Sequence, residues 1–167
     1  MKKVRKGMFE TNSSSTHTII ITDKNCEPGA LVDFQIGEFG WERRVLRTIT
    51  AKASYLYTIA CECYGRDVYQ DLYEVLAKYG VQCECSVPAV FSSDCGGYLE
   101  NGYVDHASDG MNFVDAIFHS ESRLIRYLFS GESFVVTSND NCDEDEYEEM
   151  KQKTNVPYEC EKYYKGN

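Results

Sequence analysis

The sequence lacks any stretch approaching the roughly 20 consecutive apolar residues of a membrane-spanning helix, so no membrane association is predicted. Its N-terminus begins with a basic cluster, but a polar run follows where a signal peptide has its apolar segment. Export is therefore not expected, and we predict a protein of a reducing cytoplasm.

Basic charge is also scarce: 17 Lys and Arg residues stand against 27 Asp and Glu residues, giving a net charge of −10. A length of 167 residues, with 43% hydrophobic and 26% charged residues, is typical of one globular domain. Tyrosine is unusually frequent, with 13 copies. Because tyrosine joins an apolar ring to a polar tip, the surplus suits half-buried strands, a contact surface or the cover of a small core.

The eight cysteines lack the C-x-x-C spacing of the common zinc knuckles and ribbons. Two pairs instead have the spacing C-E-C, Cys61 with Cys63 and Cys83 with Cys85. In a helix, residues two apart point in nearly opposite directions, whereas in a strand they share a face, which next to Val81 would be the core. We therefore predict free buried thiols, with neither a metal site nor a cofactor; a domain stabilised by a metal bound to the C-E-C pairs is the alternative.

Hydrophobic periodicity and end signals locate the expected elements. Residues 68–79 are the clearest helix, because Asp67 and Gln70 have capping-box spacing at its start and Gly80 follows its end. Residues 112–129 are predicted to be helical, with a break near residues 119–120. The other expected elements are a helix over 50–64 and strands over 3–9, 17–22, 31–36, 81–87, 103–106 and 134–137.

This pattern predicts an α+β fold, a single antiparallel or mixed sheet with three or four packed helices. The sequence shows no internal repeat and no linker. We expect residues 1–138 to form one α+β domain. Residues 139–167 are expected to form an acidic C-terminal segment that packs on this domain or extends from it.

Half of the net charge lies in that C-terminal segment, where nine acids and four lysines give −5. Such a segment is typical of a solvated helix or tail that keeps a protein in solution. It also suits a surface that imitates nucleic-acid phosphates and occupies a basic partner. The candidate partner-binding residues are Asp143, Glu144, Asp145, Glu146, Glu148 and Glu149.

The basic residues at the opposite end, Lys2, Lys3, Arg5 and Lys6, favour protection of an edge strand over a nucleic-acid footprint. Direct nucleic-acid binding is therefore not expected.

A polar segment before the second expected strand is the first candidate for chemistry. Its hydroxyls and backbone N–H groups could grip a phosphate, but it lacks the glycine spacing and lysine of a P-loop. A plain polar connection between two strands explains it equally well. The ligand-binding candidates are Thr11, Asn12, Ser13, Ser14 and Ser15, followed by His17 as a catalytic candidate.

The other catalytic candidates are Asp105, His106 and Asp140, which lie near the ends of expected strands. Adjacent residues of a strand point to opposite faces, so Asp105 and His106 can share a site only if the strand ends or bulges there. His106 could act as a general base or, with His17, as a metal ligand, or it could be a solvated structural histidine. A Ser14, His106 and Asp140 triad is not assigned, because neither a nucleophile elbow nor an oxyanion loop accompanies it.

The segment 5–17, RKGMFETNSSSTH, resembles the N-terminus of a group of bacteriophage and Firmicutes proteins that have no assigned activity. Residues 38–41, 52–58, 102–106 and 139–141 are similar to the same group. The resemblance implies an intracellular setting in a bacterial host and transfers no catalytic residue. In such a setting, small acidic phage proteins that block host defence proteins form a realistic class.

Two hypotheses follow for the function. The first is a small acidic binding protein of the phage type, an inhibitor of a host defence protein that occludes the surface of a basic or nucleic-acid-binding protein partner. The alternative is a nucleotide- or phosphoester-binding enzyme that uses residues 13–17 with Asp105, His106 and Asp140. The alternative predicts that these segments converge in one pocket.

Overall fold

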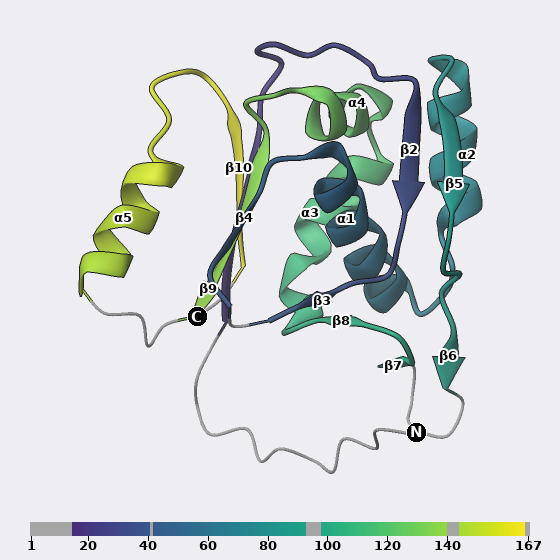
Figure 1. Ribbon diagram of the computed structural model, residues 1–167, viewed down its shortest axis with the longest axis horizontal. Coiled ribbons are helices and arrows are strands. Elements are labelled where there is room, and N and C mark those ends of the chain that lie inside the picture. The colour runs from purple at the N-terminus through teal and green to yellow at the C-terminus, as the bar shows by residue number, and fades with distance from the viewer. Residues whose placement is uncertain (1–14, 41, 93–97, 140–143, 166–167) are drawn as a thin grey trace.

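A four-stranded antiparallel sheet with the strand order β10-β1-β9-β4 is the centre of the protein (Figure 1). The computed structural model describes residues 15–40, 42–92, 98–139 and 144–165. The expected strand over 3–9 lies outside these residues. The four strands of the sheet are β1 (Ser15–Ile21), β4 (Arg44–Leu46), β9 (Phe134–Asn139) and β10 (Glu161–Lys165).

Both faces of the sheet carry apolar side chains along its two inner strands. Ile19 and Val135 face the main core, whereas Ile20 and Phe134 belong to a smaller cluster on the opposite face. A strand buried on both faces reads as a continuous apolar run, which is what residues 19–21 show.

Helix α1 (Ile49–Tyr64) lies in the middle of the main core, beside the sheet (Figure 1). Thr48 caps its N-terminus by accepting a hydrogen bond from the backbone N–H of Ala51. It ends at Gly65, whose left-handed backbone, with φ 61°, favours glycine. The expected helix over 50–64 is confirmed. Its buried residues fall on all sides of the helix rather than on one stripe, because other elements surround it.

A second layer on the far side of α1 contains β2 (Leu31–Phe34), β5 (Gln82–Cys85) and α2 (Tyr69–Lys78) (Figure 1). The two strands pair in parallel. Gly80, with φ 72°, follows the end of α2 as predicted.

The capping box expected at the start of α2 does not form. Helix α2 begins after Val68, and although Asp67 accepts from the backbone N–H of Tyr69, the side chain of Gln70 bonds Glu74 instead.

The predicted break near residues 119–120 separates α3 (Met111–Phe118) from α4 (Glu121–Phe129). Ser120 caps α4 by accepting from the backbone N–H of Arg123, and this requires an extended backbone that a continuous helix could not provide. Helices α3 and α4 flank α1 on the same side of the sheet (Figure 1). The other elements on this side of the chain's fold are short. They are β3 (Glu38–Phe39), β6 (Phe91–Ser92), β7 (Tyr98–Leu99), β8 (Tyr103–Val104) and the 3-10 helix η1 (Ala107–Gly110).

The C-terminal segment contributes α5 (Glu144–Thr154) and β10, which pairs with β1 as an edge strand of the sheet. Helix α5 stands on the face of the sheet opposite to α1, α3 and α4 (Figure 1). Among the residues that the structure describes, none of the helices combines the length and apolarity needed to cross a membrane.

Candidate functional site

Near the start of β1, the inner face of the sheet changes from apolar to polar. Ser15, His17 and Thr137 are at most 1% exposed. The Ser15 hydroxyl donates to the backbone carbonyl of Asp105 (3.3 Å), and the Thr137 hydroxyl donates to the carbonyl of Glu42 (2.7 Å). These bonds join the sheet to the loops beside β3 and β8, and satisfy polar groups that would be costly to bury alone.

His17 is fully enclosed at this polar end. Its Nδ1 shares a hydrogen bond of 2.9 Å with the hydroxyl of Tyr55, which projects from α1. Burial raises the pKa of Tyr55 far above its ordinary value, so the phenol stays neutral. Because neither side chain reaches solvent, the catalytic candidate His17 serves as a structural link between the sheet and α1 in this conformation.

This link leads to a stability prediction. Replacing Tyr55 with phenylalanine should lower the free energy of unfolding by about 1–3 kcal/mol, because His17 Nδ1 loses a partner inside the core. Tyr64→Phe is the matched control, since the Tyr64 hydroxyl bonds Asp115 at an exposed position and its loss should cost within about 0.5 kcal/mol. Urea unfolding measures the free energy of unfolding of both variants. Equal losses of stability would show that the buried hydrogen bond of Tyr55 contributes no more than the exposed one of Tyr64.

Asp105 and His106 lie where β8 has ended, so the alternation of a strand does not separate them. The backbone N–H of Asp105 donates to the carbonyl of Phe39 (2.8 Å), and His106 has a left-handed φ of 54°. His106 Nε2 lies 4.0 Å from Asp105 Oδ2. This carboxylate oxygen is enclosed and has no hydrogen-bond partner among the described residues, whereas the imidazole is exposed. The exposed imidazole of His106 could thus meet a ligand here, whereas Oδ2 of Asp105 is shielded from one.

The structure brings Ser15 against Asp105, as a shared site would require, but it encloses His17. The remaining ligand and catalytic candidates, Thr11, Asn12, Ser13, Ser14 and Asp140, lie outside the described residues, as does Asp143.

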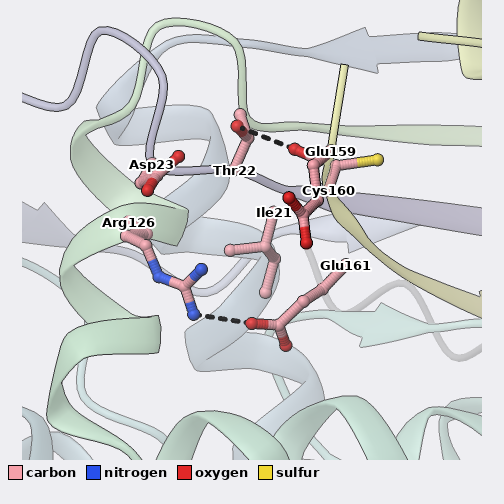
Figure 2. Close-up of a pocket in the computed structure, with 7 residues that line it drawn as sticks. All are labelled: Ile21, Thr22, Asp23, Arg126, Glu159, Cys160 and Glu161. Atoms are coloured by element: carbon pink, nitrogen blue, oxygen red, sulfur yellow. Dashed lines mark hydrogen bonds and ion pairs between the residues drawn. The ribbon is translucent and has the colours of Figure 1, made fainter. Parts of the chain in front are cut away.

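A polar cavity that sequence reasoning missed lies between the end of β1, α4 and the start of β10 (Figure 2). It has a volume of about 290 Å³. Figure 2 shows Arg126 directed at Glu161. Nη2 of Arg126 donates to Oε1 of Glu161 at 2.6 Å. Arg123 bonds the other oxygen of Glu161, also at 2.6 Å. No local pattern could reveal this grouping, because Glu161 is 35 residues from Arg126.

The two arginines beside this cavity already share one carboxylate. Burial alone would raise the pKa of Glu161, but hydrogen bonds from Arg123, Arg126 and Tyr163 outweigh burial and lower the pKa. Asp23 and Glu159 also line the cavity, so its walls hold more carboxylates than guanidinium groups. The arrangement fastens β10 to α4 and offers no free positive charge to an anion.

Helix α5 presents the acidic segment to solvent. Asp145, Glu148 and Glu149 are exposed, and Glu149 pairs with Arg43 (2.5 Å) and with Lys153 (2.6 Å). Hydrogen bonds from Lys153 and Arg43 lower the pKa of Glu149 to about 2. Arg43 therefore ties the helix to the body through one carboxylate, and the described acids Asp145 and Glu148 remain directed to solvent.

The two C-E-C pairs lie on different elements, one in α1 and the other in β5. Cys61 is buried in α1, while Cys83 and Cys85 lie half-buried along β5. The six cysteines in the described residues are free. Burial raises the pKa of the Cys61 thiol to about 12, so it remains protonated and unreactive at neutral pH. Within the described part of the chain, no three His, Cys, Asp or Glu side chains group as metal ligands.

The chain matches no protein-family model, no curated protein and no solved structure.

Proposed function

We propose that this protein is a binding protein that occupies a basic surface of a protein partner. The observation that carries the proposal is α5, whose sequence contains five acids and two lysines. Exposed side chains of this helix include those of Asp145, Glu148, Lys151 and Gln152. The helix therefore contributes surface charge rather than core packing. A helix of this kind can steer a basic partner towards the protein.

The overall charge supports the same proposal. A net charge of −10, half of it in residues 139–167, favours approach of a positively charged surface. In the phage or bacterial setting that the N-terminal resemblance implies, such a protein would act as an inhibitor by covering the functional surface of a host protein.

The alternative, a phosphoester-binding enzyme, has less support from the geometry. Of the residues it requires, Ser15, Asp105 and His106 gather at one end of the sheet, but the Ser15 hydroxyl is buried and donates to the backbone carbonyl of Asp105. His17, however, is enclosed and bonded to Tyr55, so it could not act on a substrate without a rearrangement of the core.

The proposal is tested by neutralising α5. The variant Asp145→Asn, Glu146→Gln, Glu148→Gln should bind the partner about tenfold more weakly, if each charge contributes about 0.5 kcal/mol. A control with the same change in net charge, Asp23→Asn, Glu27→Gln, Glu100→Gln, alters exposed acids in loops away from α5 and should bind nearly as wild type.

Affinity capture from a bacterial lysate with these three baits, followed by mass spectrometry, identifies the partner. Biolayer interferometry with the purified partner then compares about 0.1 M with about 1 M salt, where the Debye length falls from about 10 Å to about 3 Å. The supporting result is a basic protein whose affinity falls with salt and with the α5 changes. A partner that binds all three baits equally at both salt concentrations would refute the proposal.

A further inference from the structure

The large hydrophobic side chains that remain exposed are not spread evenly over the protein. Of the seven in the described residues, five belong to β2, to α2 and its C-cap, or to the segment after β5. These elements contact one another, and exposed apolar side chains on neighbouring elements suit an interaction surface. The five residues are Leu31, Tyr73, Tyr79, Val87 and Val90, which are 39–47% exposed.

A groove of about 420 Å³ lies between α2 and β5, and of the five residues Tyr73 lines it. Tyr73 and Ala77 form its helix side, and residues 81–84 form its strand side. The groove is open because Ala77 and Gly80 contribute almost no side chain at this point. Its volume falls within the range of about 300–1,000 Å³ that ligand sites occupy.

Hydrogen bonds hold the two walls of the groove together. The Tyr69 hydroxyl donates to the carbonyl of Cys83 (3.0 Å), which fixes β5 against α2. The Tyr69 and Tyr73 rings lie 6.2 Å apart, so Tyr73 packs on a tyrosine that is itself anchored. At the base, the backbone N–H of Gly80 donates to the carbonyl of Ala77 (3.0 Å). The groove is therefore preformed, and a ligand need not order it.

The charge of the groove selects a cation. Glu84 lines it, is exposed and forms no ion pair within the described residues. The cations at the two ends of α2 already form ion pairs, Arg66 with Asp71 and Lys78 with Glu121. The lining thus offers an aromatic ring and a carboxylate without a competing lysine or arginine.

We propose that the groove between α2 and β5 binds an arginine side chain within a basic peptide segment of the protein partner. A guanidinium group can stack on the Tyr73 ring and donate two parallel hydrogen bonds to Glu84, which an ammonium group cannot match. The proposal rests on the proposed function, a basic protein partner, and adds the place and the chemistry of one contact.

The test uses a fluorescein-labelled peptide of alternating arginine and glycine, together with the same peptide in which neutral citrulline replaces arginine. Ala77→Leu fills the groove at an exposed helix position without a change of charge, and leucine is nearly as good a helix former as alanine. Glu84→Gln removes the carboxylate. Asn112→Leu, an exposed position of α3, is the control for an added leucine elsewhere.

Fluorescence anisotropy should give an affinity for the arginine peptide that Ala77→Leu and Glu84→Gln each weaken about tenfold. Asn112→Leu should leave it unchanged, and the citrulline peptide should bind the wild type at least as weakly as the arginine peptide binds Glu84→Gln. Amide NMR shifts on titration should be largest at Gly80 and Glu84. Circular dichroism and thermal unfolding of each variant check that the fold is retained.

The outcomes separate this inference from the proposed function. If the α5 variant loses the arginine peptide while Ala77→Leu and Glu84→Gln bind it as wild type, the groove is refuted and the proposed function stands. If Ala77→Leu and Glu84→Gln lose the peptide while the α5 variant keeps the partner, the groove stands and the role of α5 is refuted. Amide NMR shifts at Gly80 and Glu84 that are equal for the arginine and citrulline peptides would show that the groove does not prefer a cation, and would refute the proposal.

Discussion

Replacing Lys52 with methionine is expected to lower the free energy of unfolding by about 3 kcal/mol near pH 9, and by less near pH 7. Lys52 lies in the first turn of α1 and is only 1% exposed. Its Nζ donates to the backbone carbonyls of Ser130 (2.9 Å) and Ser133 (3.2 Å), just beyond the end of α4. Methionine keeps most of the side-chain volume but leaves both buried carbonyls without this donor.

The pH dependence follows from the protonation state of the amine. Burial, opposed by Cys26 and assisted by Arg47, lowers the pKa of Lys52 from 10.5 to about 8. Between these values the unfolded chain binds the proton and the folded chain does not, so the stability due to Lys52 rises with pH. A neutral amine still has two N–H donors, so both carbonyls keep their hydrogen bonds while the cost of a buried charge disappears.

Urea unfolding of wild type and Lys52→Met at about pH 7 and about pH 9 measures this effect. The stability difference should grow by about 1.4 kcal/mol over this range, since pH 9 is one unit above the folded pKa. Buried tyrosines, and cysteines that Lys52 does not influence, also lose stability at alkaline pH, but they do so in both proteins and cancel in the difference. Burial raises the pKa of the Cys26 thiol and Lys52 partly offsets this rise, so the removal of Lys52 adds to the growth of the difference in the same direction. The exposed Lys78→Met is the control and should show no growth with pH. A Lys52→Met difference that stays constant or shrinks would contradict the lowered pKa.

Lys52 also illustrates what the sequence could not reveal. Its two acceptors lie 78 and 81 residues away, and no local pattern marks a lysine as buried. Elements with local end signals, by contrast, were predicted well. Gly65 and Gly80 end their helices, and Ser120 separates α3 from α4, because a backbone turn or a cap depends on residues a few positions apart.

The edge strands of the sheet were missed for a related reason. β4 and β10 are short or mixed in polarity, and each is defined by its pairing with a strand far along the chain. The α+β fold class could nevertheless be predicted, because the periodicity of the longer elements determines it.

The candidate site was predicted only in part. Residue types drew attention to Asp105, His106 and Ser15, which lie at one end of the sheet. Burial could not be foreseen for His17, because it is a polar residue at the first position of the expected strand 17–22. The cavity beside Arg126 and the groove beside Tyr73 both form between elements that are distant in the sequence or separated by a turn.

Replacing Gly102 with alanine is expected to lower the free energy of unfolding by about 3 kcal/mol and to displace the loop that carries Asp105. A Cβ atom at this position would overlap with the backbone oxygen of Gly37 and the side chain of Ile36. The overlap lies where β8 pairs with β3, beside the bond from the Tyr103 N–H to the Gly37 carbonyl (3.0 Å). Because one of the groups is backbone, the strands themselves must separate to relieve it.

Gly131→Ala separates this overlap from the general effect of removing a glycine. A Cβ atom at Gly131 would have no neighbour within 4 Å, so the same change there should leave stability within about 1 kcal/mol of wild type. Hydrogen exchange gives a second readout, because the Asp105 N–H donates to the Phe39 carbonyl (2.8 Å) and should lose protection in Gly102→Ala alone. Equal stabilities of the two variants, or an Asp105 amide that stays protected in Gly102→Ala, would show that the β3–β8 pair does not position this end of the sheet.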